Sequence, residues 1–515
     1  MRALLSVYDK TGVVDLARGL VDLGWDLVSS GGTAAALRQA GLPVTDTAEL
    51  TGFPAILGHR VVTLHPKVHG GILADRSNPH HLAELEQYGI GAIDLVVGNL
   101  YPFGTDPSDF EHGAAGAADL IDIGGPAMIR AAAKNHADVG VVVEPADYAV
   151  VLDELRAAGS LSDSTRRRLA RTAFATTAAY DRAVVEWLDA PSEDGPFPAR
   201  LDLELERVDL SLRYGENPHQ RAAAYRYAGG APPWWDGVTQ HAGMGLSYLN
   251  LFDADAAWVL VHDLAAVDDR PACAIIKHAN PCGLAIADTL ADAYRLANES
   301  DPRSAFGGIV ALNRPIDGAT VEAMVAAAQA DVVVAPAYDT GVVDALVAKR
   351  KNTRLLEAAP PVADPLHLRP VTGGLLVQDP HHVAADVSSW RVVTRRQPTA
   401  AELADAELAF RVCAWVRSNS IVLVRDGVAW GIGAGQQNRV EAGQLAAQKA
   451  AGRAAGGACA SDAFYPFPDG IDAAAEAGVA VVVQPGGSVK DDATIARADE
   501  LGLAMAFTGE RHFLH

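Results

Sequence analysis

A lysine and a histidine stand side by side at Lys277 and His278, directly after the apolar run 272–276, which is typical of a buried strand. Histidine titrates near neutral pH and can accept a proton, while lysine can stabilise negative charge that develops on a reacting group. A single pair of this kind is commonly incidental. It indicates proton transfer only when other functional groups accompany it.

The residues that follow this pair have a superficial likeness to the zinc deaminase pattern, H-x-E followed by P-C-x-x-C. Asn280 stands at the position of the glutamate, and Ala285 stands where the second cysteine would be. The sequence therefore predicts no zinc here, and we expect no metal site in the chain.

A dense polar segment occupies residues 59–71 in the N-terminal part. His65 and His69 are four residues apart, a spacing that on a helix could bind metal. Pro66 and the pair Gly70-Gly71 favour a loop instead. A loop with Arg, Thr, His and Lys suits an anionic ligand better than a metal.

The segment Ser30-Gly31-Gly32-Thr33 joins a predicted strand to a predicted helix. Glycines let a backbone approach a ligand, and the N–H groups of a helix N-terminus attract an anion. This favours a phosphate site, but the alternative is a plain turn in which Thr33 is the N-cap. Taken alone, the motif favours the plain turn.

Three further groups could take part in proton transfer: the phenol of Tyr101, the carboxylate of Asp122 and the ammonium of Lys134. Tyr101 follows the predicted strand at 95–97, and ligands of open α/β sheets bind beyond such strand ends. Each of these residues singly is compatible with a structural role; together they indicate a site.

The elements that must position these groups alternate between strands and helices, which predicts an α/β fold with a parallel sheet in the first part. Residues 190–198 contain three prolines, a glycine and two acidic residues, and mark the best domain boundary. The second part again mixes strands and helices, and its length suggests two lobes. Asp426-Gly427, between two strand-like runs, predicts a hairpin turn.

The composition narrows the class of protein. The net charge of −22 and the lack of a long basic block argue against nucleic-acid binding. No apolar stretch approaches the length of a membrane span, and the N-terminus is unlike a signal peptide. Four cysteines in 515 residues form no disulfide framework, which predicts a cytoplasmic protein.

Ten segments, taken in order, resemble one family, the bifunctional 5-aminoimidazole-4-carboxamide ribonucleotide (AICAR) transformylase/inosine monophosphate (IMP) cyclohydrolases. They are LLSVYDKTG, SSGGT, TLHPKVHGGIL, NLYPF, IDIGGPAMIRAAAKNH, LRYGENPHQ, KHANPCG, SAFGGIVALN, SNSIVL and GIGAGQQNR. The resemblance runs from Leu4 to the C-terminal His515, and ten segments in family order do not arise by chance.

The resemblance implies a methylglyoxal-synthase-like cyclohydrolase domain at residues 1–195. It implies a transformylase at 196–515, built from two cytidine-deaminase-like lobes without zinc. It also implies a homodimer and the last two steps of IMP biosynthesis, with 10-formyltetrahydrofolate as co-substrate and no tightly bound cofactor. AICAR, formyl-AICAR, IMP and folate would then be the ligands.

The resemblance also implies roles for individual residues. In formyl transfer His278 would accept the proton of the AICAR amine, Lys277 would stabilise charge and Asn419 would hydrogen-bond the tetrahedral intermediate. The nucleotide would be held by Arg213, Tyr214 and Arg511. Positions near the nucleotide or the folate are matched by Asp331, Arg439, Phe464 and Pro466.

For ring closure, the resemblance implies that Tyr101, Asp122 and Lys134 supply acid–base catalysis and oxyanion stabilisation. The nucleotide and its phosphate would contact Ser6, Lys10, Ser30, Gly31, Thr33, Arg60 and Thr63. The chain departs from the family pattern at Val62, where the family has a lysine. An alternative therefore stays open, in which only formyl transfer is catalysed and the first domain is weakened or only binds a ligand.

Overall fold

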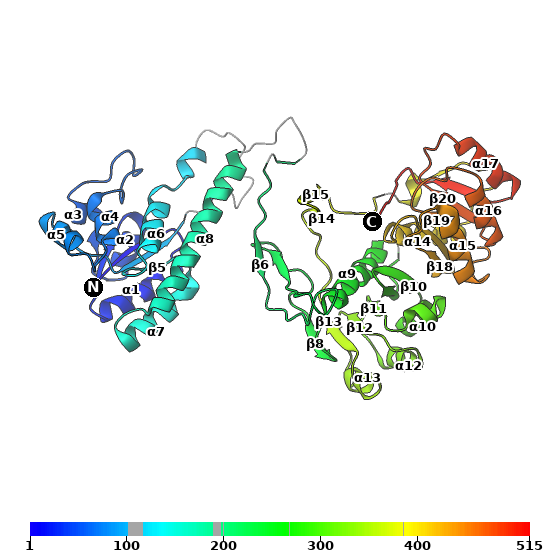
Figure 1. Cartoon of the computed structure of the whole chain (residues 1–515), viewed down its shortest axis with the longest axis horizontal. Coiled ribbons are helices and arrows are strands. Elements are labelled where there is room, and N and C mark those ends of the chain that lie inside the picture. Colours follow the sequence, from blue (N-terminus) through cyan, green and yellow to red (C-terminus); the bar gives the residue numbers. More distant parts are fainter. Residues whose placement is uncertain (101–102, 104–116, 189–196, 199, 267, 385) are drawn as a thin grey trace. The chain divides into compact units, whose positions relative to one another are not determined.

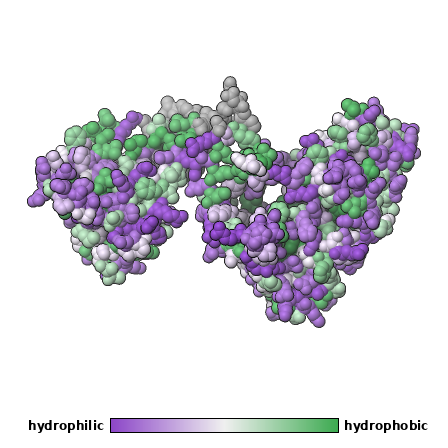
Figure 2. Space-filling model, viewed as in Figure 1, coloured by the Kyte–Doolittle hydropathy of each residue, from purple (hydrophilic) through white to green (hydrophobic). Residues whose placement is uncertain are grey.

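The computed structural model describes the chain except for residues 101–102, 104–116, 189–196, 199, 267 and 385. It divides into two compact units, Met1–Asp202 and Leu203–His515 (Figure 1). The domain boundary predicted at 195/196 lies outside the described residues. Each unit exposes a mixture of hydrophilic and hydrophobic residues on the face that Figure 2 shows, and each encloses its own apolar core.

The first unit is built on a five-stranded sheet in the order β3-β2-β1-β4-β5, and every neighbouring pair is parallel. Parallel strands covered on both faces are apolar along their whole length, which explains the continuous hydrophobic runs of the sequence. The strands are β1 (Arg2–Val7), β2 (Asp26–Ser29), β3 (Thr45–Asp46), β4 (Leu95–Asn99) and β5 (Gly140–Val142).

Helices cover this sheet, and the alternation of strands and helices confirms the predicted α/β class. They are α1 (Val13–Asp22), α2 (Gly31–Gln39), α3 (Thr47–Thr51), α4 (Pro66–Leu73), α5 (Pro79–Gln87), α6 (Gly124–Lys134), α7 (Tyr148–Ala158) and α8 (Asp163–Leu188). From the central strand β1 the sheet grows first towards β2 and then, after the chain crosses back, towards β4. The point of reversal is where open α/β sheets bind ligands.

The prediction of a loop across residues 65–71 is wrong. Residues 66–73 form helix α4, with Pro66 in its first turn and Nδ1 of His65 accepting a hydrogen bond from the N–H of Lys67 at 3.1 Å. Proline is well tolerated at the start of a helix because the N–H that it lacks has no intrahelical partner there. The proline therefore marks a helix start, where the prediction took it as evidence for a loop.

The second unit is built on a twelve-stranded mixed sheet in the order β16-β21-β20-β19-β17-β18-β10-β9-β11-β12-β13-β8. Its strands are β8 (Thr239–Ala242), β9 (Ala272–Lys277), β10 (Asn280–Ile286), β11 (Ile309–Leu312), β12 (Val332–Ala335), β13 (Arg354–Glu357), β16 (Arg391–Val392), β17 (Ile421–Arg425), β18 (Val428–Gly433), β19 (Ala458–Ser461), β20 (Val481–Gln484) and β21 (Ala504–Phe507). Two small ribbons stand apart from it, made of β6 (Leu205–Arg207) with β7 (Tyr225–Tyr227), and of β14 (His367–Val371) with β15 (Gly374–Gln378).

The twelve strands fall into two lobes of the same topology, which confirms the predicted pair of lobes. In each lobe an antiparallel hairpin pairs with a third, antiparallel strand, two further strands lie parallel to that third strand, and an antiparallel edge strand ends the lobe. The order is β10-β9-β11-β12-β13-β8 in the first lobe and β18-β17-β19-β20-β21-β16 in the second. The lobes meet where β10 pairs with β18 through Ala285 and Val428. The predicted turn at Asp426-Gly427 is confirmed as the tip of the β17–β18 hairpin.

On one face of the large sheet, one helix from the first lobe and one from the second pack into the same apolar core. The other helices cover the opposite face, over two separate cores. The shared core is formed under α9 (Tyr248–Asp263) and α14 (Ala400–Ala414). The remaining helices are α10 (Leu290–Ser300), α11 (Pro302–Ala305), α12 (Gly318–Ala326), α13 (Val342–Arg350), α15 (Arg439–Ala450), α16 (Asp469–Glu476) and α17 (Asp491–Glu500). In the described part of the chain, no helix has both the length and the apolar character to cross a bilayer.

Candidate active sites

The first unit has two adjoining cavities, of about 820 and 470 Å³, beyond the carboxyl ends of β1 and β2. Both are lined by Ser6, Ser30, His59, Val62 and Asp122. The predicted contacts Lys10, Gly31 and Thr33 line only the larger cavity, and Arg60 and Thr63 only the smaller. The fold thus gathers all seven predicted nucleotide contacts of this unit, together with Asp122, around one space.

The start of helix α2 forms one wall of the larger cavity. Ser30 is the N-cap residue with an extended backbone, and its side chain makes no capping bond. Thr33 is buried and its hydroxyl exchanges hydrogen bonds with the backbone of Val7, at 2.9 and 3.1 Å. Thr33 therefore anchors the helix to β1, and the alternative in which it serves as the N-cap is wrong. The first-turn N–H groups of α2 stay available for an anion.

The carboxylate of Asp122 lies where the two cavities join, at the start of helix α6. Its Oδ1 accepts a hydrogen bond from the N–H of Gly125 at 2.9 Å, and its own N–H donates to the hydroxyl of Tyr180 at 2.7 Å. A Cβ on Gly125 would collide with the other carboxylate oxygen. The glycine pair after Asp122 is therefore what lets the helix start close to the acid.

Of the predicted catalytic residues of this unit, only Asp122 is found in the described lining of the cavities. Lys134 ends helix α6, so it lies about 15 Å along the axis from the helix start beside Asp122. It is not among the described residues that line either cavity. Tyr101 lies outside the described residues.

In the second unit, Lys277 and His278 lie at the tip of the β9–β10 hairpin. His278 and Ala279 form the two-residue turn, with φ angles of 53° and 54°. Left-handed backbone at two successive residues is the conformation of a type I′ turn, which normally selects Asn and Gly. Neither residue here is glycine, so the turn holds the histidine in an uncommon conformation of the kind that clusters at functional sites.

The lysine and its neighbours lie along one edge of the large sheet. Nζ of Lys277 donates a hydrogen bond to the carbonyl of Gly307 at 2.8 Å. Lys277 Nζ and Asp331 Oδ1 lie 3.2 and 3.7 Å from the position that a Cβ on Gly307 would take. Gly307 itself has a φ of 66°. A larger residue there would crowd both charged groups.

A group of arginines completes this end of the site. The guanidinium of Arg213 lies over the ring of Tyr214, 5.1 Å from its centroid. Arg354, at the start of β13, donates from its guanidinium to the carbonyls of Gly245 and Asp331, each at 3.2 Å. Burial, together with the nearby positive charge of Arg213, lowers the pKa of Arg354. Two guanidinium groups at close range make this end of the site attractive to an anion.

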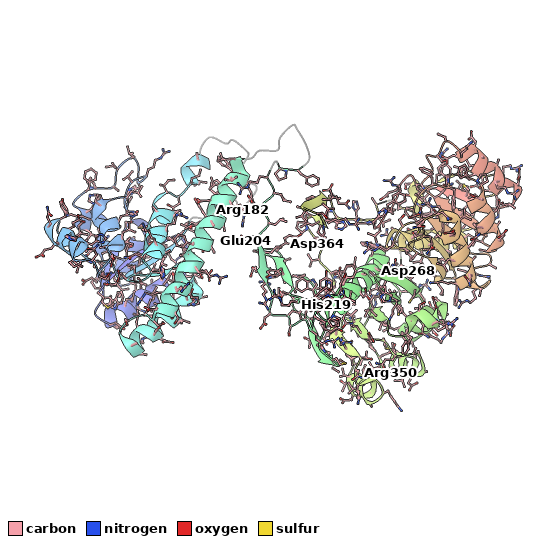
Figure 3. All side chains as sticks on the ribbon, viewed as in Figure 1. Arg182, Glu204, His219, Asp268, Arg350 and Asp364 are labelled. Carbon is pink, nitrogen blue, oxygen red and sulfur yellow. The ribbon has the colours of Figure 1, made fainter. Side chains whose placement is uncertain are left out.

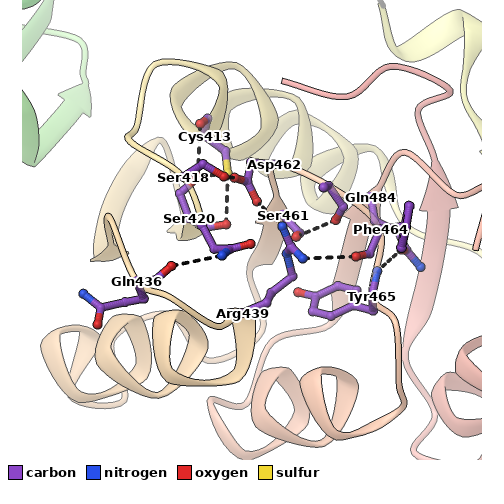
Figure 4. Close-up of polar contacts among 12 residues, drawn as sticks. Cys413, Ser418, Ser420, Gln436, Arg439, Ser461, Asp462, Phe464, Tyr465 and Gln484 are labelled. Carbon is purple, nitrogen blue, oxygen red and sulfur yellow. Dashed lines mark hydrogen bonds and ion pairs between the residues drawn. The ribbon is translucent and has the colours of Figure 1, made fainter. Parts of the chain in front are cut away.

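The second lobe supplies a separate polar cluster, in which Figure 4 labels Ser418, Arg439 and Asp462. The side-chain amide of Asn419 donates to the carbonyl of Gln436 at 3.0 Å. Arg439 forms an ion pair with the buried Asp462 at 2.8 Å and donates to the carbonyl of Phe464 at 3.3 Å. Asp462 also accepts from the hydroxyl of Ser418. This network fixes the backbone on both sides of Asn419.

Hydrogen bonds join the two clusters of the second unit. Oδ1 of Asn280 accepts from the N–H of Arg417 at 3.0 Å, which ties the β9–β10 hairpin to the segment that carries Asn419. The C-terminal segment lies against the same region, since the N–H of Ser418 donates to the carbonyl of Leu514 at 2.9 Å. Arg511 lies over the ring of Phe513 at 4.5 Å. Pro466 is exposed in the segment that follows β19.

Comparison with known proteins adds the family to this geometry. The MGS-like domain matches residues 12–127, and the AICARFT/IMPCHase bienzyme matches residues 132–449. The bifunctional purine biosynthesis protein PurH of Parvibaculum lavamentivorans is 50% identical over 534 residues, covering 100% of this chain and 97% of that protein. The chain belongs to the AICARFT/IMPCHase bienzyme family.

A solved structure described as the crystal structure of ForH is 42% identical and covers 36% of this chain and 98% of its own, with a TM-score of 0.34. The family membership confirms the predicted fold class and makes the chain an enzyme of purine biosynthesis with both transformylase and cyclohydrolase activity. The alternative in which the first domain only binds a ligand is not favoured.

Four residues that adjoin these candidate sites were not among the predicted site residues. His59 has a φ of 72° and lines both cavities of the first unit. Asp253 accepts a hydrogen bond from the N–H of Ala279 at 2.8 Å, and Asp462 holds Arg439. Arg354 could have been found, because an arginine that opens an apolar strand of buried residues requires polar partners. His59 opens the polar segment 59–71 that was interpreted as an anion site, whereas Asp253 and Asp462 lack any comparable local signal.

A further cavity of about 440 Å³ adjoins the back of the hairpin, with Ile276, Ala279, His381 and Asp364 in its wall. Figure 3 labels Asp364. Burial raises the pKa of this carboxylate, and the nearby positive charge of His367 opposes that effect.

Across the described residues there is no cluster of three or more His, Cys, Asp or Glu able to hold a metal ion. The thiol of Cys282, after the KHANP segment, is buried, which raises its pKa to about 12.

Proposed function

We propose that formyl transfer takes place at the tip of the β9–β10 hairpin. The 5-amino nitrogen of AICAR attacks the formyl carbon of 10-formyltetrahydrofolate, and His278 accepts the proton that this nitrogen loses. Lys277 and Asn419 stabilise the oxygen of the tetrahedral intermediate. The intermediate then collapses by breaking the bond to the folate nitrogen, which takes up a proton as it leaves. The strained turn at His278 and Ala279 is the observation that supports this assignment best.

The nucleotide is held, on this proposal, by the arginines at the same sheet edge. Arg213 and Arg511 neutralise the phosphate, Tyr214 packs beside Arg213, and Asp331 accepts from the ligand. The folate lies towards the second lobe, near Arg439, Phe464 and Pro466. The support is the bond between Asn280 and Arg417, which brings the two clusters to one edge. No tightly bound cofactor is required, because the folate is consumed as a co-substrate.

Ring closure takes place in the two joined cavities of the first unit. The carboxamide nitrogen of formyl-AICAR attacks the formyl carbon, and loss of water gives IMP. Asp122 and Tyr101 supply acid–base and oxyanion-stabilising groups, while Lys134, which lies outside the described lining of both cavities, would have to reach the ligand from the far end of α6. The phosphate is bound by the start of α2 and by Lys10, with Ser6, Ser30, Gly31, Thr33, Arg60 and Thr63 around the nucleotide.

A pair of variants in the full-length chain tests both assignments. His278→Ala should lose formyl transfer but close the ring of synthetic formyl-AICAR at the wild-type rate, and Asp122→Asn should do the reverse. Ultraviolet absorbance follows each reaction. Loss of both activities in either variant, with the fold intact, would contradict the separation of the two sites.

The domain assignment 1–195 for ring closure and 196–515 for formyl transfer belongs to the same proposal, as do a homodimer and a cytoplasmic location. Large apolar side chains exposed on α9 next to Tyr214, such as Tyr248 and Phe252, support a dimer. The four cysteines are free and buried, as in a reducing compartment.

A chain truncated near Glu193 should fold and bind IMP. Light scattering of the full chain should give the mass of two copies.

A further inference from the structure

The two lobes of the second unit position their hairpins with the same device. Helices α9 and α14, which precede the two hairpins, both begin with a capping box, at Ser247 and Thr399. Six residues beyond each cap stands an aspartate, Asp253 in the first lobe and Asp405 in the second. Both side chains reach the backbone N–H groups of the hairpin turn that follows in the same lobe.

In the second lobe this contact serves an ordinary turn. The two oxygens of Asp405 accept from the N–H groups of Asp426 and Gly427, each at 3.0 Å. Asp-Gly is the dipeptide that a type I′ turn prefers, because glycine takes a positive φ at no steric cost. This turn would therefore form without help, and the aspartate adds stability to it.

In the first lobe the same contact holds a turn that the sequence does not favour. Oδ1 of Asp253 accepts from the N–H of Ala279 at 2.8 Å, and both His278 and Ala279 have positive φ without a glycine. Ala279 is 7% exposed and packs inward, whereas His278 lies exposed at the tip. The turn conformation is what places the imidazole, so whatever holds the turn also places the imidazole.

We infer that Asp253 is a positioning residue for formyl transfer: it holds the His278–Ala279 turn in the conformation that presents His278 to the substrate amine. The inference rests on the proposed role of His278. Burial raises the pKa of Asp253, against the opposing effects of the Ala279 hydrogen bond and of the charges on His278 and Lys277. A half-buried acid beside a reacting pair would be unfavourable unless its contacts were needed.

The repeat provides a matched control for the test, in which Asp253→Ala is compared with Asp405→Ala in the full-length enzyme. Displacing a reacting group by about 1 Å can cost roughly 10²-fold in rate. We expect Asp253→Ala to lower kcat for formyl transfer by about 10- to 10²-fold, with a smaller change in KM for AICAR. Asp405→Ala should lose comparable thermal stability and keep kcat within about twofold of wild type.

A second variant separates positioning from general destabilisation. Ala279→Gly lets the turn adopt positive φ without support, so Asp253→Ala/Ala279→Gly should regain kcat severalfold over Asp253→Ala. If Asp253→Ala does not fold, Asp253→Val, which fills the space with a side chain that has no acceptor oxygen, takes its place in the same comparison.

Wild-type kcat in Asp253→Ala, an equal loss in Asp405→Ala, or no recovery in the double variant would overturn the inference. His278→Ala distinguishes this failure from a failure of the proposed function. If His278→Ala retains formyl transfer, the proposed function is wrong. If His278→Ala loses transfer while Asp253→Ala does not, only the positioning role is wrong.

Discussion

The two candidate sites of the chain are built in opposite ways. The ring-closure site is bounded by helix starts and by the turn at 57–60, and its cationic side chains Lys10 and Arg60 are exposed. The formyl-transfer site lies along the edge of a large sheet, where Lys277, Asn280 and Asn419 are each hydrogen-bonded to backbone groups. One site is an open cavity with exposed cationic side chains, and the other is a network of side chains hydrogen-bonded to the backbone.

This difference determines what a substitution does. In an open cavity, neighbouring cations can replace one another, so Lys10 and Arg60 can supply positive charge that Val62 does not. In a hydrogen-bonded network, removal of one partner leaves buried polar groups unsatisfied and shifts the others. Substitutions of the cationic cavity contacts in the first unit should therefore act mainly on binding, and those in the network of the second unit on kcat and stability.

The largest effect is expected from Lys277→Ala and His278→Ala. Loss of a general base or of a charge-stabilising group costs about 10²–10⁴-fold in rate, so formyl transfer should fall by that factor in each variant. Ring closure of synthetic formyl-AICAR should be unchanged, since the proposed function places it in the other unit. Lys349→Ala, an exposed lysine on α13 of the same unit, is the control and should retain both rates. Wild-type transfer in Lys277→Ala or in His278→Ala would show that the hydrogen-bonded network at this sheet edge does not carry out formyl transfer.

The α/β class, the parallel sheet and the Asp426-Gly427 turn followed from the sequence because each depends on local pattern. The His278-Ala279 turn did not, since neither residue signals a turn and only the pairing of β9 with β10 forces one. The helix at 66–73 was missed because Pro66 was weighed as a breaker without its N-terminal position. Contacts such as Asp253 with Ala279 join distant residues, which no local pattern reports.

Val62→Lys should raise kcat/KM for ring closure. Val62 lines both cavities, so an introduced ammonium would face the ligand. A donor aimed at developing charge is worth about 10²–10³-fold. Because Lys10 and Arg60 already supply positive charge nearby, we expect roughly a tenfold gain.

The control for this substitution is Val150→Lys, which adds the same charge at an exposed position on α7. It should leave kcat/KM unchanged, which excludes a long-range effect of net charge. Steady-state kinetics and thermal melting of both variants decide the point. An unchanged or lower value in a stably folded Val62→Lys would show that the cavity no longer places position 62 against a charged part of the ligand.

A smaller effect is expected at His59. The turn at 57–60 is closed by hydrogen bonds between Ile56 and Val61, and Leu57, Gly58 and His59 all have positive φ. His59→Gly should relieve backbone strain and keep or raise the melting temperature, while removing a ring that can hydrogen-bond the ligand. One hydrogen bond is worth about 0.5–1.5 kcal/mol, so KM for formyl-AICAR should rise by about two- to tenfold.

Leu57→Gly is the matched control for His59→Gly. Leu57 has a φ of 54° in the same turn, is 70% exposed and is absent from the described lining of both cavities. It should gain the same backbone relief without any change in KM. Equal KM values in the two glycine variants would mean that His59 only shapes the turn.

The smallest expected effect is on thermal stability, at His381. It tests whether the packing of the second unit makes its stability depend on pH. His381 packs against Trp415 and His512, with ring centroids 4.9 and 5.2 Å away. Burial lowers the pKa of His381 from 6.5 to about 4, and the nearby His512 adds to the effect. Because the folded-state pKa is depressed, the neutral ring contributes stability that is present above pH 6.5. That contribution is lost as the pH falls from about 6.5 towards 4. Since the side chain is only part-buried, solvent screening limits the loss to on the order of 1–2 kcal/mol.

His381→Gln, which carries no titratable group, should be less stable than wild type at pH 7.5, and the gap in melting temperature should narrow as the pH falls to 5. Melting curves of both proteins across this range decide the point. Parallel curves would show that His381 titrates like an exposed histidine, and that the packing around it does not couple this part of the second unit to pH.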